Sequence, residues 1–470
     1  MNTVSLNAQV GGKTSSAAAT PAEEFWYSSH SAVAFTVFLL FLVQTISFLI
    51  PPFQSPDEPA HLMRAYLMSK GEVFLGSKNG TTGGNIDTGF LNYINSFNEL
   101  QYNNKVTNST VRMSGKIEWS GKRQFSELPN TAFYFPLPYL PQAIAFAIGE
   151  KSGLTVRESY YLARLFSLLA TLGLILAALL LYPVPIIVLA VFVTPMTLFQ
   201  LGSASLDSVT FGLSALTGAL FMRGANAKFS FSTNMHLAFI VCLFSLAASR
   251  IALFALTPLP VVLYTTRKSR SYLIASSVVI CLSSAWTIYA LETVKGVLPR
   301  ELTTIEIIQY YLFRPASFVH VFINTITNGS VLEGYWRMFV GVLGGLDTPL
   351  GSEIYVGFGF LFAALVILSL GRKPASVLMN GSIALACGAL CSLLLMFFAF
   401  LVTYTPHPAK MIEGIQGRYF IPIFILLAYS IFNRRLSYHE VRVGLILLSL
   451  MIALAIVGAT PRLLERYWVV

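Results

Sequence analysis

Long apolar runs dominate this sequence and most constrain what it can fold into. The 470 residues contain about eleven such runs, separated by short charged turns. Runs of this kind match helices that cross the hydrocarbon layer, whereas a β-barrel shows short strands of alternating hydrophobicity. Only 11% of the residues are charged, against about a quarter in a soluble chain. The sequence therefore predicts an all-α integral membrane protein and excludes a soluble enzyme, a secreted module and a DNA-binding protein.

The distribution of charge predicts the orientation. Lys and Arg total 31 against 21 Asp and Glu, and in a membrane protein such an excess reflects topology and anionic headgroups, not nucleic acid. After a first helix at 32–50, we expect crossing helices at 160–181, 184–201, 206–222, 235–248, 251–265, 272–291, 354–370, 379–402, 419–432 and 443–457. Ten bases then share the side of the N-terminus with one acid, Glu440; they are Arg223, Lys228, Arg267, Lys268, Arg270, Arg372, Lys373, Arg434, Arg435 and Arg442. This asymmetry places the N-terminus in the cytoplasm.

Two apolar stretches affect the count of crossings. Residues 131–149 are apolar but rich in proline, and a full crossing there would send all ten bases outward. We therefore expect them to lie along the outer surface or dip into it.

Residues 235–265 are interrupted only by Ser249-Arg250 and could form one long helix or a hairpin of two. The basic clusters at both ends favour the hairpin, which gives about eleven transmembrane helices and an external C-terminus.

The predicted organisation alternates membrane segments with two long external loops. The segments are a disordered cytoplasmic tail (1–31), the first transmembrane helix (32–50), an extracytoplasmic loop with juxtamembrane helices (51–157), transmembrane helices (158–291), a second extracytoplasmic loop (292–353), further transmembrane helices (354–458) and an extracytoplasmic tail (459–470). Loops as long as the first usually carry function in a compact bundle.

The nine residues 56–64 (PDEPAHLMR) follow the first helix and have the composition of a helix start. The second proline suits the first helical position, which leaves Glu58 at the cap and Asp57 just before it, where the helix dipole keeps carboxylates ionised. His61 and Arg64 are three residues apart and share a face. The cluster could be a capped helix with a structural ion pair. Its position after a membrane span, with an arginine available for an anion, favours a functional role.

Polar side chains from separate segments fall on the predicted outer face, close to the membrane: Asp57, Glu58, Asp207, Asp347 and Arg418. The interiors of the predicted spans hold essentially no ionisable residue. Ion-coupled transporters usually need charges near the midplane. The pattern therefore favours surface chemistry on a membrane-bound substrate over transport.

Five short motifs resemble the GT-C superfamily of polytopic glycosyltransferases, which use polyprenyl-phosphate-linked sugars, and specifically a bacterial family of uncharacterised polytopic membrane proteins assigned to it. They are SPDEPAH at 55–61, FPLPY at 135–139, SASLD at 203–207, GVLGGLDTPL at 341–350 and GIQGRYF at 414–420. Together they span most of the chain. One departure is Gly345, where the family is expected to have a larger, often aromatic, residue. The resemblance implies a GT-C-type helical bundle whose two long extracytoplasmic loops carry interfacial helices.

The resemblance also implies catalytic roles. In GT-C enzymes an acidic residue of the first external loop is the general base, which carries over to Asp57, with Glu58 as the alternative. A carboxylate suits this role because it can take the proton of an acceptor hydroxyl that attacks the anomeric carbon. Asp207 resembles the second acidic position of the superfamily, although a helix cap explains it equally well.

The phosphate that leaves needs fixed cations, for which Arg418 is the first candidate and Arg64 the second. Tyr419 and Gln416 flank Arg418 and are expected to assist it. Arg418 could equally be a snorkelling anchor at a helix end. His61, Asp207 and Asp347 are expected to support the site. A divalent cation such as Mg²⁺ or Mn²⁺ is conceivable, with candidate ligands Asp57, Glu58, His61 and Asp207, although Glu-x-x-His alone is no metal signature.

We therefore expect an inverting glycosyltransferase of the cytoplasmic membrane, with its active site facing the periplasm or exterior. Its expected partners are a polyprenyl-phosphate sugar donor such as undecaprenyl phosphate-hexose, an envelope glycan acceptor such as the O-antigen of lipopolysaccharide, and the lipid bilayer. Two alternatives remain open, a glycan polymerase or ligase with a diphosphate-linked lipid donor, and a lipid-linked glycan flippase or other transporter.

Overall fold

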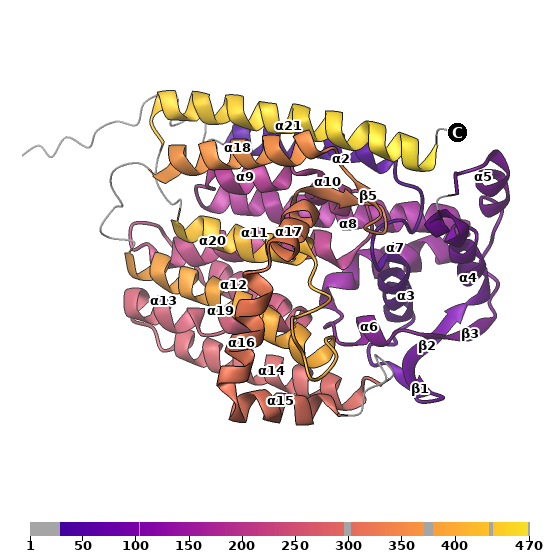
Figure 1. Ribbon diagram of the computed structural model, residues 1–470, viewed down its shortest axis with the longest axis horizontal. Helices are drawn as coiled ribbons and strands as arrows, with labels where there is room; N and C mark the ends of the chain where they lie inside the picture. The colour runs from indigo at the N-terminus through magenta and orange to yellow at the C-terminus, as the bar shows by residue number, and fades with distance from the viewer. Residues whose placement is uncertain (1–28, 103, 296–301, 371–378, 432–435, 469–470) are drawn as a thin grey trace, which may run out of the picture.

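The computed structural model describes residues 29–102, 104–295, 302–370, 379–431 and 436–468, and these residues are mostly helical. Most of the predicted N-terminal tail lies outside them, as do four of the ten predicted cytoplasmic bases, Arg372, Lys373, Arg434 and Arg435. Figure 1 shows a bundle of roughly parallel helices, with the first long loop gathered at one end of it.

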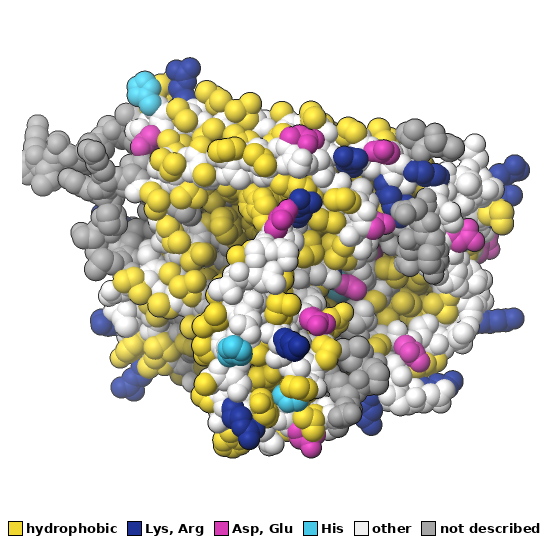
Figure 2. All heavy atoms as spheres, in the orientation of Figure 1, with side chains coloured by type: hydrophobic (Ala, Val, Ile, Leu, Met, Phe, Trp, Pro, Cys, Tyr) yellow, Lys and Arg dark blue, Asp and Glu magenta, His cyan; other side chains and the backbone are white. Residues whose placement is uncertain are grey.

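Six helices of the described chain are long and apolar enough to cross a membrane: α2 (Ser29–Ser47), α8 (Val156–Leu181), α14 (Ser271–Thr293), α18 (Ser352–Leu370), α19 (Met379–Thr403) and α21 (Tyr438–Tyr467). Their outward faces carry exposed hydrophobic side chains, among them Phe41, Ile274, Phe360, Ile367, Ile446 and Val457. Over α18 and α21 such side chains cover much of the face in Figure 2, whereas charged ones gather toward the first long loop. Apolar surface of this extent fits contact with lipid. The protein is therefore a multi-pass membrane protein.

The remaining predicted crossings correspond to shorter or broken helices. They are α9 (Ile186–Phe192), α10 (Pro195–Leu201), α11 (Leu206–Ala225), α12 (Thr233–Ser249), η3 (Ile251–Leu256), α13 (Leu259–Arg267) and α20 (Phe420–Ile431). Only α10 and α11 qualify as a joint seventh span, and they are bent by 110°. By length and composition the described residues thus give six or seven crossings, and the expected number of about eleven is not confirmed.

The apolar region 235–265, left open between one helix and two, is interrupted in the structure. Helix α12 ends at Ser249, and Arg250 has an extended backbone with φ −135° and ψ 101°. The short helix η3 follows, and Pro258 precedes α13. The charged residue within the apolar run therefore marks the break between two helical segments.

The first long loop folds into short helices around a small sheet. Its elements are α3 (Glu58–Ser69), β1 (Gly76–Lys78), β2 (Thr81–Asp87), α4 (Thr88–Asn95), η1 (Asn98–Tyr102), α5 (Asn108–Ser114), β3 (Arg123–Glu127), α6 (Pro129–Ala132), η2 (Leu137–Tyr139) and α7 (Leu140–Lys151). The three strands pair antiparallel in the order β1-β2-β3. Leu62, Tyr66, Phe90 and Phe146 form part of a separate apolar core. The proline-rich stretch 131–149 contains no crossing span, because its longest helix, α7, has 12 residues and packs against α3 and α8.

The second long loop is also helical. It contains α15 (Thr304–Phe313), α16 (Pro315–Ile326), α17 (Gly329–Gly341) and a two-stranded hairpin of β4 (Val342–Leu343) and β5 (Thr348–Pro349). The small sheets in the two loops were not part of the all-helical prediction. Helix α17 packs against η4 (Gly417–Tyr419), the short turn that precedes α20.

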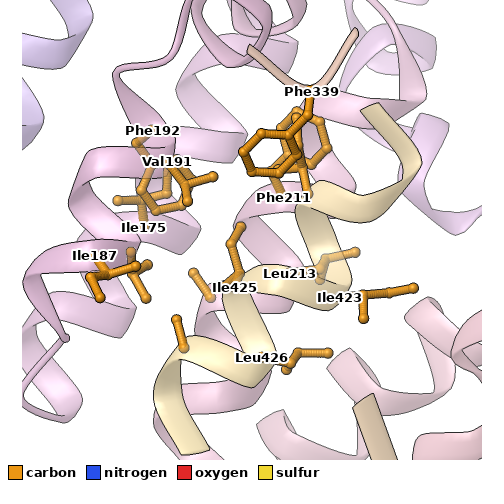
Figure 3. Packing of buried hydrophobic residues seen from close by; sticks show 14 of the residues in the cluster. Ile175, Ile187, Val191, Phe192, Phe211, Leu213, Phe339, Ile423, Ile425 and Leu426 are labelled. Atoms are coloured by element: carbon orange, nitrogen blue, oxygen red, sulfur yellow. The ribbon is translucent and has the colours of Figure 1, made fainter. Parts of the chain in front are cut away.

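The main core lies around α11 and α20, which contact each other and α8, α9, α12 and α19. Figure 3 shows Ile423, Ile425 and Leu426 of α20 among side chains from several other helices. Helix α11 is buried over almost its whole surface. Since the core holds these two helices rigidly, it also fixes the residues at their N-terminal ends, Asp207 and Arg418.

Candidate functional site

Four segments far apart in the sequence bring charged side chains together at the end of the bundle that carries the first long loop. Asp57 precedes α3, Asp207 lies in the first turn of α11, Arg250 follows α12 and Arg418 lies in η4. We call these four residues the open cluster. They form a continuous chain of ion pairs from Asp57 to Arg418, Asp207 and Arg250.

Arg418 is the centre of the open cluster and is buried, with 1% of its side chain exposed. Each of its three nitrogens donates to a described partner. Nε donates to Gln416 Oε1 (2.7 Å), Nη1 to Asp207 Oδ2 (2.9 Å) and the Pro56 carbonyl (3.4 Å), and Nη2 to Asp57 Oδ2 (2.8 Å) and the Tyr419 hydroxyl (3.3 Å). Because a guanidinium has five N–H groups, these five contacts use its full capacity.

The glycine before Arg418 is required by packing. A Cβ at Gly417 would lie 2.1 Å from the carbonyl oxygen of Tyr335 and 2.4 Å from the amide nitrogen of Phe339, both in α17. The backbone of η4 therefore approaches α17 as closely as only glycine allows. This contact holds the turn that places Arg418 beside both aspartates.

Asp57 is the accessible member of the cluster. Its side chain is 42% exposed, and its backbone adopts the left-handed conformation with φ 61° and ψ 3°. A non-glycine residue in this conformation costs on the order of 1 kcal/mol, and such strain often occurs at functional sites. Oδ2 accepts from Arg418, while Oδ1 has no hydrogen-bond donor within the described part of the chain. One carboxylate oxygen is thus available to a ligand.

In the sequence Arg250 was noted only as an interruption of the apolar stretch 235–265, yet it belongs to the candidate site. Its Nη2 pairs with Asp207 Oδ1, and its Nη1 lies 3.4 Å from the Tyr134 hydroxyl. The guanidinium stacks 4.8 Å from the ring centroid of Tyr134 and 5.6 Å from that of Tyr419. Beyond these contacts, the described residues supply no acceptor for the remaining N–H groups of Arg250. The signal in the sequence was a single arginine inside 31 otherwise apolar residues.

A cavity of about 180 Å³ opens beside these groups. Asp207, Arg250, Arg418, Tyr134 and Tyr419 line its polar part. Its remaining walls are largely apolar and come from η3, α14, α19 and α20, with side chains such as Leu253, Leu291, Met396, Phe400 and Ile423. A cavity with apolar walls and cations at one side fits a ligand that joins an apolar chain to an anionic group.

Glu58, the alternative base, has a different environment from its neighbour Asp57. It is fully buried, and its Oε1 accepts from the Tyr160 hydroxyl (3.0 Å), Arg164 Nε (3.3 Å) and the Ala204 amide (3.1 Å). Oε2 accepts from the Ser55 amide at 3.4 Å. We call Glu58, Tyr160 and Arg164 the closed cluster. Arg164 also donates to the carbonyls of residues 50 and 51, so this cluster ties the end of the first helix to α3 and α8.

Two further predicted residues lie apart from the open cluster. Arg64 is buried and donates to the carbonyls of Val73 (2.6 Å) and Glu72 (3.5 Å), which hold the turn after α3. Asp347 pairs with Arg466 of α21 at 2.7 Å. In this structure both side chains fix loops, and neither lines the cavity.

His61 supports the site from α3. Its Nδ1 lies 2.8 Å from the Tyr139 hydroxyl, and its ring stacks on Tyr134 with centroids 5.8 Å apart. Burial lowers the pKa of His61 to about 4, against the opposing influence of Asp57 and Asp207. The imidazole is therefore neutral at neutral pH.

The candidate metal ligands do not gather as a metal site. Among the described residues, no group of three or more His, Cys, Asp or Glu side chains is arranged to hold a metal ion. Oδ2 of Asp57 and Oδ2 of Asp207 pair with Arg418, Oδ1 of Asp207 pairs with Arg250, and Oε1 of Glu58 pairs with Arg164. Because guanidinium groups already neutralise these carboxylates, the arrangement does not fit a divalent cation.

Comparison with known proteins identifies a family for most of the chain. The sequence model of the family described as "Predicted membrane protein (DUF2142)" matches residues 39–427. This range includes all members of the open and closed clusters. No curated protein and no solved structure matches the chain.

Proposed function

The chain belongs to the DUF2142 family of predicted membrane proteins, and we propose that it is an inverting glycosyltransferase of the GT-C type. It transfers a sugar from a polyprenyl-phosphate donor, such as undecaprenyl phosphate, to a cell-envelope glycan such as O-antigen. In this proposal the shorter apolar helices complete a bundle of about eleven spans in the cytoplasmic membrane. The N-terminus is cytoplasmic, and the cavity faces the periplasm.

One observation carries the proposal: two arginines, Arg250 and Arg418, line the polar side of an apolar cavity, and Arg418 also pairs with a partly exposed aspartate, Asp57. The apolar walls suit the first isoprene units of a lipid, and Arg250 and Arg418 suit its phosphate. Asp57 pairs with Arg418, so an anomeric carbon attached to that phosphate lies within reach of the carboxylate.

The chemistry requires a single carboxylate base. Oδ1 of Asp57 takes the proton of the acceptor hydroxyl, and the hydroxyl oxygen attacks the anomeric carbon from the side opposite to the phosphate. This displacement inverts the anomeric configuration. The second nearby carboxylate, Glu58, supports this reading because four hydrogen bonds and complete burial keep it from acting as a nucleophile.

Arg250 supplies the first contact with the donor phosphate in this proposal. It lines the cavity, has N–H groups without an acceptor among the described residues, and lies over the rings of Tyr134 and Tyr419. A guanidinium fixed in this way can bind phosphate with little loss of side-chain freedom. Arg64, the second candidate from the sequence, has no place in this contact.

The experiment compares envelope polysaccharide from cells that express the wild-type chain with polysaccharide from cells that express Asp57→Asn or lack the chain. We expect a mass increment of one sugar per repeat that depends on the wild-type chain and is lost with Asp57→Asn at equal membrane expression. A changed polysaccharide chain length would instead identify a polymerase or ligase. An increment retained by Asp57→Asn would contradict the proposed base.

A further inference from the structure

On the basis of the proposed function, we infer that Arg418 exchanges partners during the reaction. In the resting site its Nη2 neutralises Asp57, and after proton transfer the same N–H groups neutralise the phosphate that leaves. One guanidinium thereby couples the base to the leaving group.

The exchange follows from the use of donors in the open cluster. All five N–H groups of Arg418 are engaged, and two of its partners are carboxylates. The four charged residues balance, with two negative and two positive side chains. Arg418 therefore has no free N–H group for a phosphate unless one of its partners changes.

Asp57 is the partner that changes, because the proposed reaction protonates it. Asp207 accepts from both arginines and is almost completely buried, so it stays in place. Asp57 has a single described ion pair and an exposed side chain. A protonated carboxyl is a much weaker acceptor for a guanidinium than a carboxylate, so Nη2 of Arg418 is released.

The charges balance through the step. The acceptor O–H bond breaks and its proton moves to Asp57, while the acceptor oxygen forms a bond to the anomeric carbon. The bond from that carbon to the phosphate oxygen breaks, and its electron pair stays on the phosphate. The carboxylate loses one negative charge as the phosphate monoanion becomes a dianion. Arg418 lies beside the Asp57 carboxylate, where one negative charge is lost, and next to the phosphate, where one is gained. Arg250 stays in contact with the phosphate throughout.

Binding of the product lipid tests the exchange without turnover. Asp57→Asn is a neutral substitute of the same shape for the protonated carboxyl, and it replaces a partly exposed side chain. The purified full-length chain in detergent should bind undecaprenyl phosphate about tenfold more tightly as Asp57→Asn than as wild type. Undecaprenol, which lacks phosphate, should show no gain. Asp347→Asn is the matched control, since it also neutralises an arginine-paired aspartate but lies away from the cavity.

A double variant separates the exchange from a general loss of negative charge. Asp57→Asn/Arg418→Lys keeps the positive charge but lacks the planar fork of donors, so we expect it to lose most of the tenfold gain. A gain that persists in this double variant overturns the exchange. Equal affinity of wild type and Asp57→Asn also overturns it, while leaving the proposed function intact. If neither the wild type nor any variant binds undecaprenyl phosphate, the proposed function itself fails.

Discussion

Asp57 and Glu58 are neighbours in sequence, yet the structure places them in opposite environments. Asp57 belongs to the open cluster, with a left-handed backbone and 42% of its side chain exposed. Glu58 belongs to the closed cluster and is fully buried against Tyr160 and Arg164. Both carboxylates face an arginine, so the presence of an ion pair does not distinguish them. The distinction is whether an oxygen remains for a ligand.

The difference originates in the backbone at the start of α3. Glu58 is the first helical residue, and its side chain points into the bundle toward α8. The left-handed backbone at Asp57 turns the chain, so that the side chain of Asp57 points toward η4 instead. The buried ion pair of Glu58 and Arg164 fixes the start of α3, and this gives rigid support to the neighbouring pair of Asp57 and Arg418.

Removing the proposed base should give the largest effect and tests the comparison directly. Asp57→Asn should lower the rate of sugar transfer at saturating substrates about 10³-fold, because the amide cannot accept the proton. Its melting temperature in detergent should stay close to that of the wild type, since the side chain is partly exposed. Glu58→Gln is the paired variant, and it should retain a far higher rate per folded molecule. Equal losses of rate in two well-folded variants would remove the distinction between the clusters.

Breaking the closed cluster should reduce stability, not chemistry. Arg164→Met leaves the carboxylate of Glu58 buried without its cation, which costs about 3 kcal/mol of folding free energy. The measurement is thermal unfolding of the purified chain in detergent. The double variant Glu58→Gln/Arg164→Met should recover much of the loss, because no unpaired charge remains. A melting temperature of Arg164→Met equal to that of wild type would show that the closed cluster is no anchor.

Weakening the proposed phosphate contact should have an intermediate effect confined to the open cluster. Arg250→Gln should raise the KM for the donor about thirtyfold, equivalent to about 2 kcal/mol, with a smaller change in kcat. Arg64→Gln is the control, because Arg64 holds a loop away from the cavity. Initial rates at varied donor concentration distinguish the two. A larger effect on the KM for the donor from Arg64→Gln than from Arg250→Gln would assign the phosphate contact to Arg64, the second candidate from the sequence.

The sequence predicted which segments meet but not how each side chain is used. The motifs around Asp57, Asp207 and Arg418 were predicted to lie at one face, and in the structure their side chains are in direct contact. The sequence did not distinguish the environments of Asp57 and Glu58, because these depend on the left-handed backbone at Asp57, which no pattern of residue types encodes.

Other features depend on contacts between distant segments, which a single sequence does not reveal. Arg250 was overlooked because its partners Asp207 and Tyr134 lie 43 and 116 residues away. Asp347 lies in a motif of the same resemblance, yet its partner is Arg466, near the end of the chain. The predicted number of about eleven crossings is not confirmed by length and composition, because several of the apolar runs form helices as short as α9 and α20.

The smallest expected effect concerns His61, whose burial next to the open cluster can be tested by the dependence of stability on pH. Its ring faces Asp57 and Asp207, which favour protonation, and Arg250 and Arg418, which oppose it, while burial lowers its pKa to about 4. In the unfolded chain the His61 imidazole takes up a proton near its ordinary pKa of about 6.5, whereas in the folded chain it stays neutral at that pH. The stability contributed by neutral His61 is thus complete above pH 6.5 and falls as the pH approaches 4, with a loss of about 1.5 kcal/mol between pH 6.5 and 5. Melting temperatures of wild type and His61→Asn across this range should therefore converge toward acid pH. Parallel curves would mean that water reaches His61, so that solvent enters the open cluster beyond the exposed side chain of Asp57.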